Sequence, residues 1–139
     1  PSTGRWAINI TKDRKNTPVD NKIKNNIILN DRTDRGAILI YASGVQGFES
    51  DYNVVVDRFS VDEGKTIISL STWQGYGYDL NSIISTASAL FADPNNKDFH
   101  LKTGSPAIDA GTTLTEVTDD MEGVSRPQGD AYDIGCYED

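Results

Sequence analysis

Cysteine, histidine and long apolar runs are almost missing from this sequence of 139 residues. The single cysteine, Cys136, excludes an intrachain disulfide and a zinc site built from several thiolates. No run of about 18 apolar residues occurs, so the sequence predicts no transmembrane helix and no membrane insertion. No signal peptide is visible, and the chain begins Pro-Ser-Thr-Gly without a methionine. We therefore expect a processed product or a piece of a longer protein.

Positive charge is also scarce. The chain has 13 lysines and arginines against 21 aspartates and glutamates, which gives a formal net charge of -8. A nucleic-acid partner needs a basic stripe that neutralises phosphates, and none is present. The composition therefore predicts no nucleic-acid partner and disfavours tight binding to an anionic membrane. Arginines still gather locally at Arg32, Arg35 and Arg58, and such a cluster can bind an anionic substrate.

The two candidate nucleophiles do not fit their chemistry. Cys136 lies in an apolar alternation, which predicts a small buried hydrophobic residue. Ser105 lacks the glycine two residues later that a Gly-x-Ser-x-Gly elbow requires. The only histidine, His100, forms no persuasive pair with an aspartate for a triad. The catalytic residues, if any, stay unknown from the sequence.

A repeat of short strands fills the first half of the chain. A strand at Trp6–Ile10 is followed by a charged loop and a second strand at Ile23–Leu29. The same order returns as Gly36–Tyr41, a loop, and Ser50–Val56. We expect a third pass to begin at Thr66–Leu70. Coils of this length cannot bury their inward side chains alone, so the repeat predicts a solenoid of stacked β-coils.

Asparagine stands at the same place in both copies. When the copies are aligned, Ala7 corresponds to Ala37, and Asn26 corresponds to Asn53 at a slightly shorter offset. Asparagine tolerates the left-handed backbone that a sharp bend between two strands needs. We therefore predict that Asn26 and Asn53 lie above one another and that their amides form hydrogen bonds along the stack.

The second half has a different texture. Ser71 is expected to cap a short helical turn, and residues 82–92 are expected to be irregular with at most one short turn. The last forty residues are rich in glycine and proline turns around Ala107 and Ile108. A final strand is predicted at Ile134–Tyr137. This region is expected to form a cap over the stacked coils.

Several motifs of the second half resemble the C-terminal end of right-handed parallel β-helix proteins of the pectate-lyase type. The motifs are Ser71–Gln74, Asp79–Ser82, Leu90–Pro94, Asp98–Leu101, Gly104–Gly111, Arg126–Pro127 and Asp133–Glu138. The resemblance extends from Ile23 to Glu138. It implies an all-β fold: a right-handed parallel β-helix of about three terminal coils at residues 1–70, closed by an irregular C-terminal cap at residues 71–139 of the same domain.

The resemblance also implies a function. Its group includes secreted bacterial polysaccharide lyases, epimerases and cell-surface proteins, which implies a secreted, periplasmic or cell-surface location. We expect the C-terminal part of a polysaccharide lyase that acts on an acidic, uronate-containing polysaccharide. This chain alone is not expected to be catalytically complete, because no catalytic motif maps onto it. The alternative is a non-catalytic surface or adhesin-like module that binds glycan or acts as a rigid spacer.

Five residues are the predicted substrate contacts. Arginine forks recognise carboxylates, so Arg32, Arg35 and Arg58 are candidates for uronate binding, against the alternative of a solvated loop with surface ion pairs. Tyr76 and Tyr78 lie among glycines and are candidate platforms for sugar rings. Trp73 is instead expected to plug the cap.

Metal and partner expectations are modest. The acidic run at residues 93–98 lacks the glycine and distal glutamate of a calcium loop, which favours a simple Asx-turn. No cofactor is predicted for this chain, although the resemblance allows calcium in the parent protein. An open first coil exposes strand edges, which proteins avoid. We therefore expect Trp6–Ile10 to stack on preceding coils of the parent or on a second chain.

Overall fold

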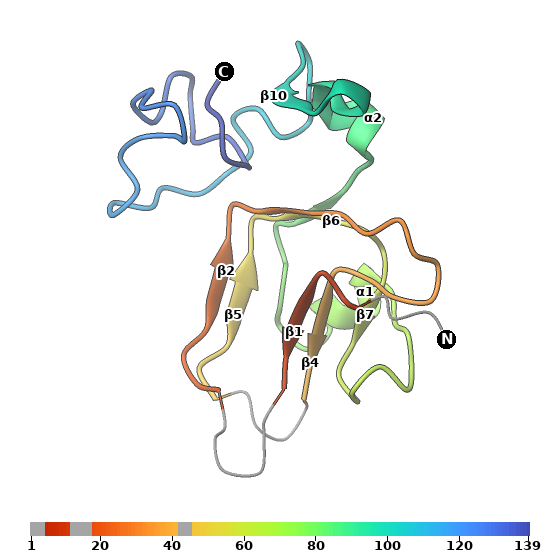
Figure 1. Cartoon of the computed structure of the whole chain (residues 1–139). Coiled ribbons are helices and arrows are strands. Elements are labelled where there is room, and N and C mark those ends of the chain that lie inside the picture. The colour runs from red at the N-terminus through yellow and green to blue at the C-terminus, as the bar shows by residue number, and fades with distance from the viewer. Residues whose placement is uncertain (1–4, 12–17, 42–45) are drawn as a thin grey trace.

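The computed structural model describes residues 5–11, 18–41 and 46–139, and residues 1–4 of the predicted coil region lie outside them. The chain is rich in short strands, as the sequence predicts, with few and short helices (Figure 1). The strands are β1 (Ile8–Ile10), β2 (Lys22–Lys24), β3 (Ile27–Ile28), β4 (Ile38–Ile40), β5 (Glu49–Asp51), β6 (Val54–Val55), β7 (Phe59–Ser60), β8 (Ile83–Ile84), β9 (Phe91–Asp93) and β10 (Asp98–Leu101). The helices are α1 (Leu70–Gln74), α2 (Ala87–Leu90) and the 3-10 helix η1 (Pro94–Asn96).

Three short sheets are parallel, and each takes one strand from successive passes of the chain. Their orders are β1-β4-β7, β2-β5 and β3-β6-β8 (Figure 1). Ile8 pairs with Ile38, which confirms the alignment that matches Ala7 with Ala37. Ile27 pairs with Val54, which confirms the shorter offset that matches Asn26 with Asn53. We call a set of residues aligned across successive passes a rung.

The predicted start of the third pass is wrong. The strand that extends the first sheet is β7, where Phe59 pairs with Ile38. The predicted segment Thr66–Leu70 instead forms one antiparallel bridge, from Ile68 back to Phe59, and then begins α1. β7 therefore follows β4 sooner than the repeat predicts, and the chain turns back on β7 before it enters α1.

The bend between β2 and β3 recurs between β5 and β6. Asn25 and Tyr52 have φ of 56° and take the left-handed backbone at these bends. The prediction of a left-handed bend is therefore right, but it is placed one residue late, at Asn26 and Asn53. The predicted bond along the stack is present with a different main donor: the backbone N–H of Asn26 donates to Asn53 Oδ1 at 2.9 Å, while the predicted pair of side-chain amides is 3.5 Å apart from Nδ2 to Oδ1.

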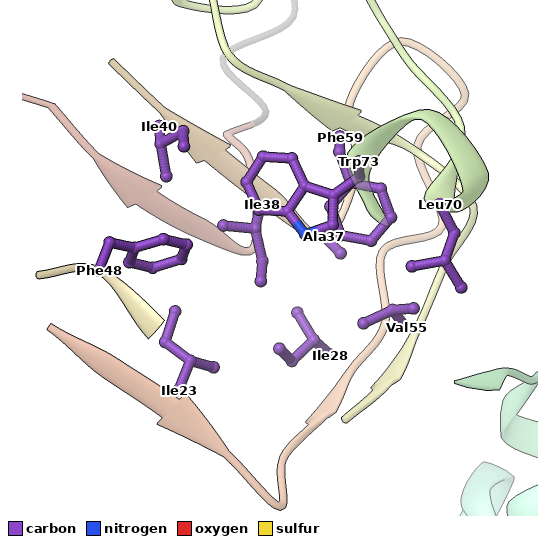
Figure 2. Close-up of a cluster of buried hydrophobic side chains, with 10 residues drawn as sticks. All are labelled: Ile23, Ile28, Ala37, Ile38, Ile40, Phe48, Val55, Phe59, Leu70 and Trp73. Carbon is purple, nitrogen blue, oxygen red and sulfur yellow. The ribbon is translucent and has the colours of Figure 1, made fainter. Parts of the chain in front are cut away.

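The main apolar core lies inside the turns of the three parallel sheets (Figure 2). The indole of Trp73 is fully buried, as expected for a plug, and stacks on Phe59 with ring centroids 4.9 Å apart. Trp73 lies on α1, so this helix closes the core beside β7. The buried members are Ile23, Ile28, Ala37, Ile38, Ile40, Phe48, Val55, Phe59, Leu70 and Trp73.

A second core lies on the opposite face of the β3-β6-β8 sheet. Side chains alternate between the faces of a strand, so Val55 enters the main core while its neighbour Val54 enters the second. Residues 87–134 supply the other wall, through Leu90, Leu101 and Ile134 among others. Figure 1 shows this C-terminal region alongside β6. It packs against the side of the stacked strands.

Residues 82–92, predicted to be irregular, instead contain β8, α2 and the start of β9. Three further local predictions in the C-terminal half are wrong. The cap of α1 is Ser69, whose side chain accepts from Thr72 N–H, and Ser71 lies within the helix. Residues 134–137 form no strand, and residues 134–136 are bends, because their backbone bonds go to separate segments: Ile134 N–H to Ala107 O and Gly135 N–H to Asn25 O. Alternating residues face opposite sides only in a strand, so the pattern does not bury Cys136 here, and Cys136 is exposed.

A buried polar network ties the passes together around Asn53. Its Nδ2 donates to Ile23 O at 3.0 Å and to Asp79 Oδ1 at 2.9 Å. Asp79 also accepts from the indole Nε1 of Trp73 at 2.7 Å and from the hydroxyl of Ser82 at 2.6 Å. Buried polar groups are tolerated when they are bonded in this way, and the network gives the core a fixed register.

Replacing Asn53 should destabilise the fold far more than replacing its aligned partner. Asn53→Ala leaves the Asn26 N–H and the Asp79 carboxylate short of buried partners, so we expect a loss of about 2–4 kcal/mol in the free energy of unfolding. Asn26→Ala, at an exposed side chain, should cost about 0.5 kcal/mol. Urea unfolding of the two variants measures both values. Equal losses would contradict the central role of Asn53.

Candidate functional site

The three arginines of the predicted cluster bond to different partners within the chain. Arg32 binds Asp34, with 2.8 Å between Nη2 and Oδ1, and hydrogen bonding by Arg32 is the main cause of the lowered pKa of Asp34. Arg58 donates from Nε to the backbone oxygen of Arg35 and from Nη2 to that of Asn30 at 2.7 Å. Arg58 therefore holds the loop in place with its guanidinium. Arg35 also bonds within the loop: its Nη1 donates to Asp34 O at 2.5 Å and lies 3.5 Å from Asp34 Oδ2.

The two predicted tyrosines lie in different environments. Tyr76 is 56% exposed and follows α1. Tyr78 packs into the aromatic cluster of the main core, with ring centroids 5.0 Å from both Phe48 and Trp73. A ring held between two others offers little open face. Tyr76 keeps the exposed ring that a sugar platform needs.

Arg35 lines a small hollow on the outer face of the β1-β4-β7 sheet, which we call the arginine hollow. It measures about 230 Å³. Gly64 approaches the sheet closely here: a Cβ on it would come within 3.2 Å of Leu39 Cδ1 and of Trp6 Nε1. The lining residues are Arg5, Trp6, Asn9, Arg35, Leu39, Glu63 and Gly64.

Sequence reasoning missed Arg5, although the repeat carried the signal. Ala7 N–H donates to Gly36 O and Ile8 N–H to Ala37 O, so the two passes are in register ahead of β1. The offset that aligns Ala7 with Ala37 also aligns Arg5 with Arg35. The hollow is therefore lined by two arginines from consecutive passes, together with Glu63 and Asn9. Arginine and asparagine side chains can donate hydrogen bonds to a small carboxylate ligand, whereas the carboxylate of Glu63 opposes one.

A second, larger hollow of about 560 Å³ lies between β3 and the C-terminal region, and we call it the apolar groove. Its walls are mostly apolar and aromatic, with asparagines and Asp31 at the β3 side. Cys136, exposed, lies on the opposite wall. The lining residues are Asn25, Asn26, Ile27, Leu29, Asn30, Asp31, Ala87, Phe91, Phe99, Leu101, Gly135, Cys136 and Tyr137.

His100 lies beside this groove in an acidic setting. Its Nδ1 lies 2.6 Å from Asp98 Oδ1, its Nε2 lies 3.4 Å from Glu122 Oε2, and its ring stacks on Tyr137 at 4.1 Å between centroids. Hydrogen bonding to Asp98, and then to Glu122, raises the pKa of His100. The protonated ring thus joins β10 to the turn that carries Glu122.

Other site chemistry is limited within the described residues. Asp93 accepts from Asn96 Nδ2 at 2.7 Å and caps η1, in agreement with an Asx-turn. No group of three or more histidine, cysteine, aspartate or glutamate side chains in the described ranges could hold a metal ion. No helix there is long and apolar enough to cross a bilayer. No protein-family model, curated protein or solved structure matches the chain with significant similarity.

Raising the pH should loosen the contact around His100. Its pKa in the folded chain lies above the ordinary value of 6.5, so its stabilising contribution is complete below about pH 6.5 and is lost as the pH rises through the folded pKa. An NMR titration of the single imidazole measures the shift. Asp98→Asn should move the pKa down toward 6.5 more than Glu122→Gln, because Asp98 is the larger cause. An unshifted titration in the unmodified chain would contradict this assignment.

Proposed function

We propose that the chain is the C-terminal part of a carbohydrate-active protein, and that the arginine hollow binds a uronate group of an acidic polysaccharide. The proposed fold is a right-handed parallel β-helix. Three features support that fold: parallel pairing in three sheets, sequence offsets of similar length between most paired strands, and an apolar core inside the turns. Secretion and a location in the periplasm or at the cell surface belong to the same proposal.

The observation that carries the proposed binding is the pairing of Arg5 and Arg35 in one hollow. Guanidinium groups bind carboxylates through two parallel hydrogen bonds. Asn9 adds an amide, and Trp6 adds an indole edge, which together suit the hydroxyl groups and the ring of a sugar. The size of the hollow fits a single sugar unit. It therefore supplies a peripheral contact, with lyase chemistry proposed for other coils of the parent protein.

The second candidate is a non-catalytic surface module or rigid spacer. It is favoured by Arg32 and Arg58, whose charges are engaged within the chain and which therefore stabilise the loop between β3 and β4. The two candidates differ in whether the hollow discriminates between acidic and neutral glycans. A spacer needs no such discrimination.

Uronate binding should depend on Arg35 and should improve when Glu63 is neutralised. We expect galacturonate and mannuronate oligomers to shift the NMR signals of Trp6 and Asn9. Arg35→Ala should weaken the affinity about tenfold through the loss of a charge-assisted pair. Glu63→Gln removes from the hollow a negative charge that repels the uronate, and it should strengthen the affinity severalfold. Binding is measured by NMR titration at fixed salt.

Lys22→Ala is the matched control, since it removes the same charge from an exposed side chain on a different sheet. It should leave the affinity unchanged. A neutral galactose oligomer should not shift the same signals. Equal binding of acidic and neutral oligomers, or equal losses in the Arg35 and Lys22 variants, would refute uronate recognition and favour the spacer.

A further inference from the structure

β3 is an edge strand with one open side. Its only strand partner among the described residues is β6. Val54 N–H donates to Asn26 O at 2.8 Å, and the backbone groups of a parallel strand point alternately to its two sides. The N–H and C=O of Ile27 therefore point away from β6, along the edge that borders the apolar groove.

The groove lies at the Ile27 end of a row of aligned apolar side chains. Ile83, Val54 and Ile27 are aligned in register, and all three face the second core. The opposite wall of the groove includes Phe99, which is 43% exposed and packs edge-to-face on Phe91 with centroids 5.2 Å apart. The groove thus has the position of a fourth apolar residue in this rung.

A ladder of side-chain hydrogen bonds leads to the same place. Asn53 N–H donates to Ser82 Oγ at 2.8 Å, and Asn26 N–H donates to Asn53 Oδ1 at 2.9 Å. In each step the later pass offers a side-chain oxygen to the backbone of the earlier one. Asn26 lines the groove, and its Nδ2 is bonded to Lys24 O at 2.7 Å. No donor from the described residues reaches Asn26 Oδ1, so the ladder ends on an unused acceptor.

We infer that the apolar groove binds one further parallel β-strand. Its backbone N–H bonds to Asn26 Oδ1, and the next residue is aliphatic and packs between Ile27 and Phe99. The occupant is a preceding coil of the same polypeptide, so the inference rests on the proposed β-helix fold. Within residues 5–11, 18–41 and 46–139, no strand pairs with β3 on the side away from β6, so the position is not filled by a described strand.

A second copy of the chain is a poor continuation of the stack. The far end of the first sheet is closed, because Ile68 bridges back to Phe59 and Trp73 stacks on the same ring. The β7 edge of one copy therefore cannot pair with the β1 edge of another. A preceding coil meets no such obstacle, since β1, β2 and β3 each have one strand partner among the described residues.

Extending the chain by one coil tests the inference. A copy of residues 21–34 is joined directly to Arg5, which reproduces the natural connection from β3 to Arg35. The exposed thiol of Cys136 reports on the groove. We expect its rate of reaction with a thiol reagent to fall about tenfold and Tm to rise by roughly 3 °C or more. The matched control carries aspartate in place of the copied isoleucine that corresponds to Ile27, and it should behave like the unextended chain.

Other results would overturn the inference. Unchanged Cys136 reactivity and Tm in the extended chain would show that the groove takes no strand. Protection by a free peptide of residues 21–29, but not by the extension, would assign the groove to a separate polypeptide. Protection of Cys136 in the unextended chain that appears together with dimerisation, as measured by sedimentation, would assign the groove to a second copy. Uronate titration of the same variants tests the arginine hollow separately, and its failure would count against the proposed glycan binding alone.

Discussion

The buried amide of Asn53 holds three successive passes of the chain in register. It accepts from Asn26 N–H in the first pass and donates to Asp79 in the third, while the backbone N–H of Asn53 donates to Ser82 Oγ. Asp79 then fixes the indole of Trp73, which closes the main core. A buried network of this kind tolerates only one register, because any slip would leave several polar groups unbonded. The apolar rungs can therefore stack in a single way.

The left-handed bends at Asn25 and Tyr52 explain why the protein has two cores. Each bend redirects the chain so that the following pair of residues has one side chain in the main core and one outside it. An outward row of Ile27, Val54 and Ile83 cannot stay in water without cost. The C-terminal region covers it, and Asn25 anchors that cover by accepting from Thr112 N–H at 2.8 Å and donating to Thr112 O at 2.7 Å. The bend thus joins the strands to the region that covers their side.

The sequence predicts the regular part of this fold and loses the irregular part for physical reasons. The register of the first two passes, and the bond between Asn26 and Asn53, follow from a repeat that each copy preserves. The third pass escapes prediction because Phe59 follows its partner Ile38 at a shorter offset than the one that separates Ile38 from Ile8, so the repeat is not preserved there. The exposure of Cys136 depends on tertiary bonds of Ile134 and Gly135 that no local pattern encodes. The position of Arg5 beside Arg35, in contrast, follows from the offset that aligns Ala7 with Ala37.

The arginine hollow arises from the repeat. Arg5 and Arg35 line one hollow because consecutive passes bring aligned residues side by side, with strand backbones about 4.8 Å apart. Two nearby cations repel each other, and the carboxylates of Asp34 and Glu63 lower this cost. The chain as a whole carries a net charge of -8, so long-range attraction does not draw a polyanion to it. The proposed binding of a uronate therefore depends on short-range hydrogen bonds within the arginine hollow and not on net charge.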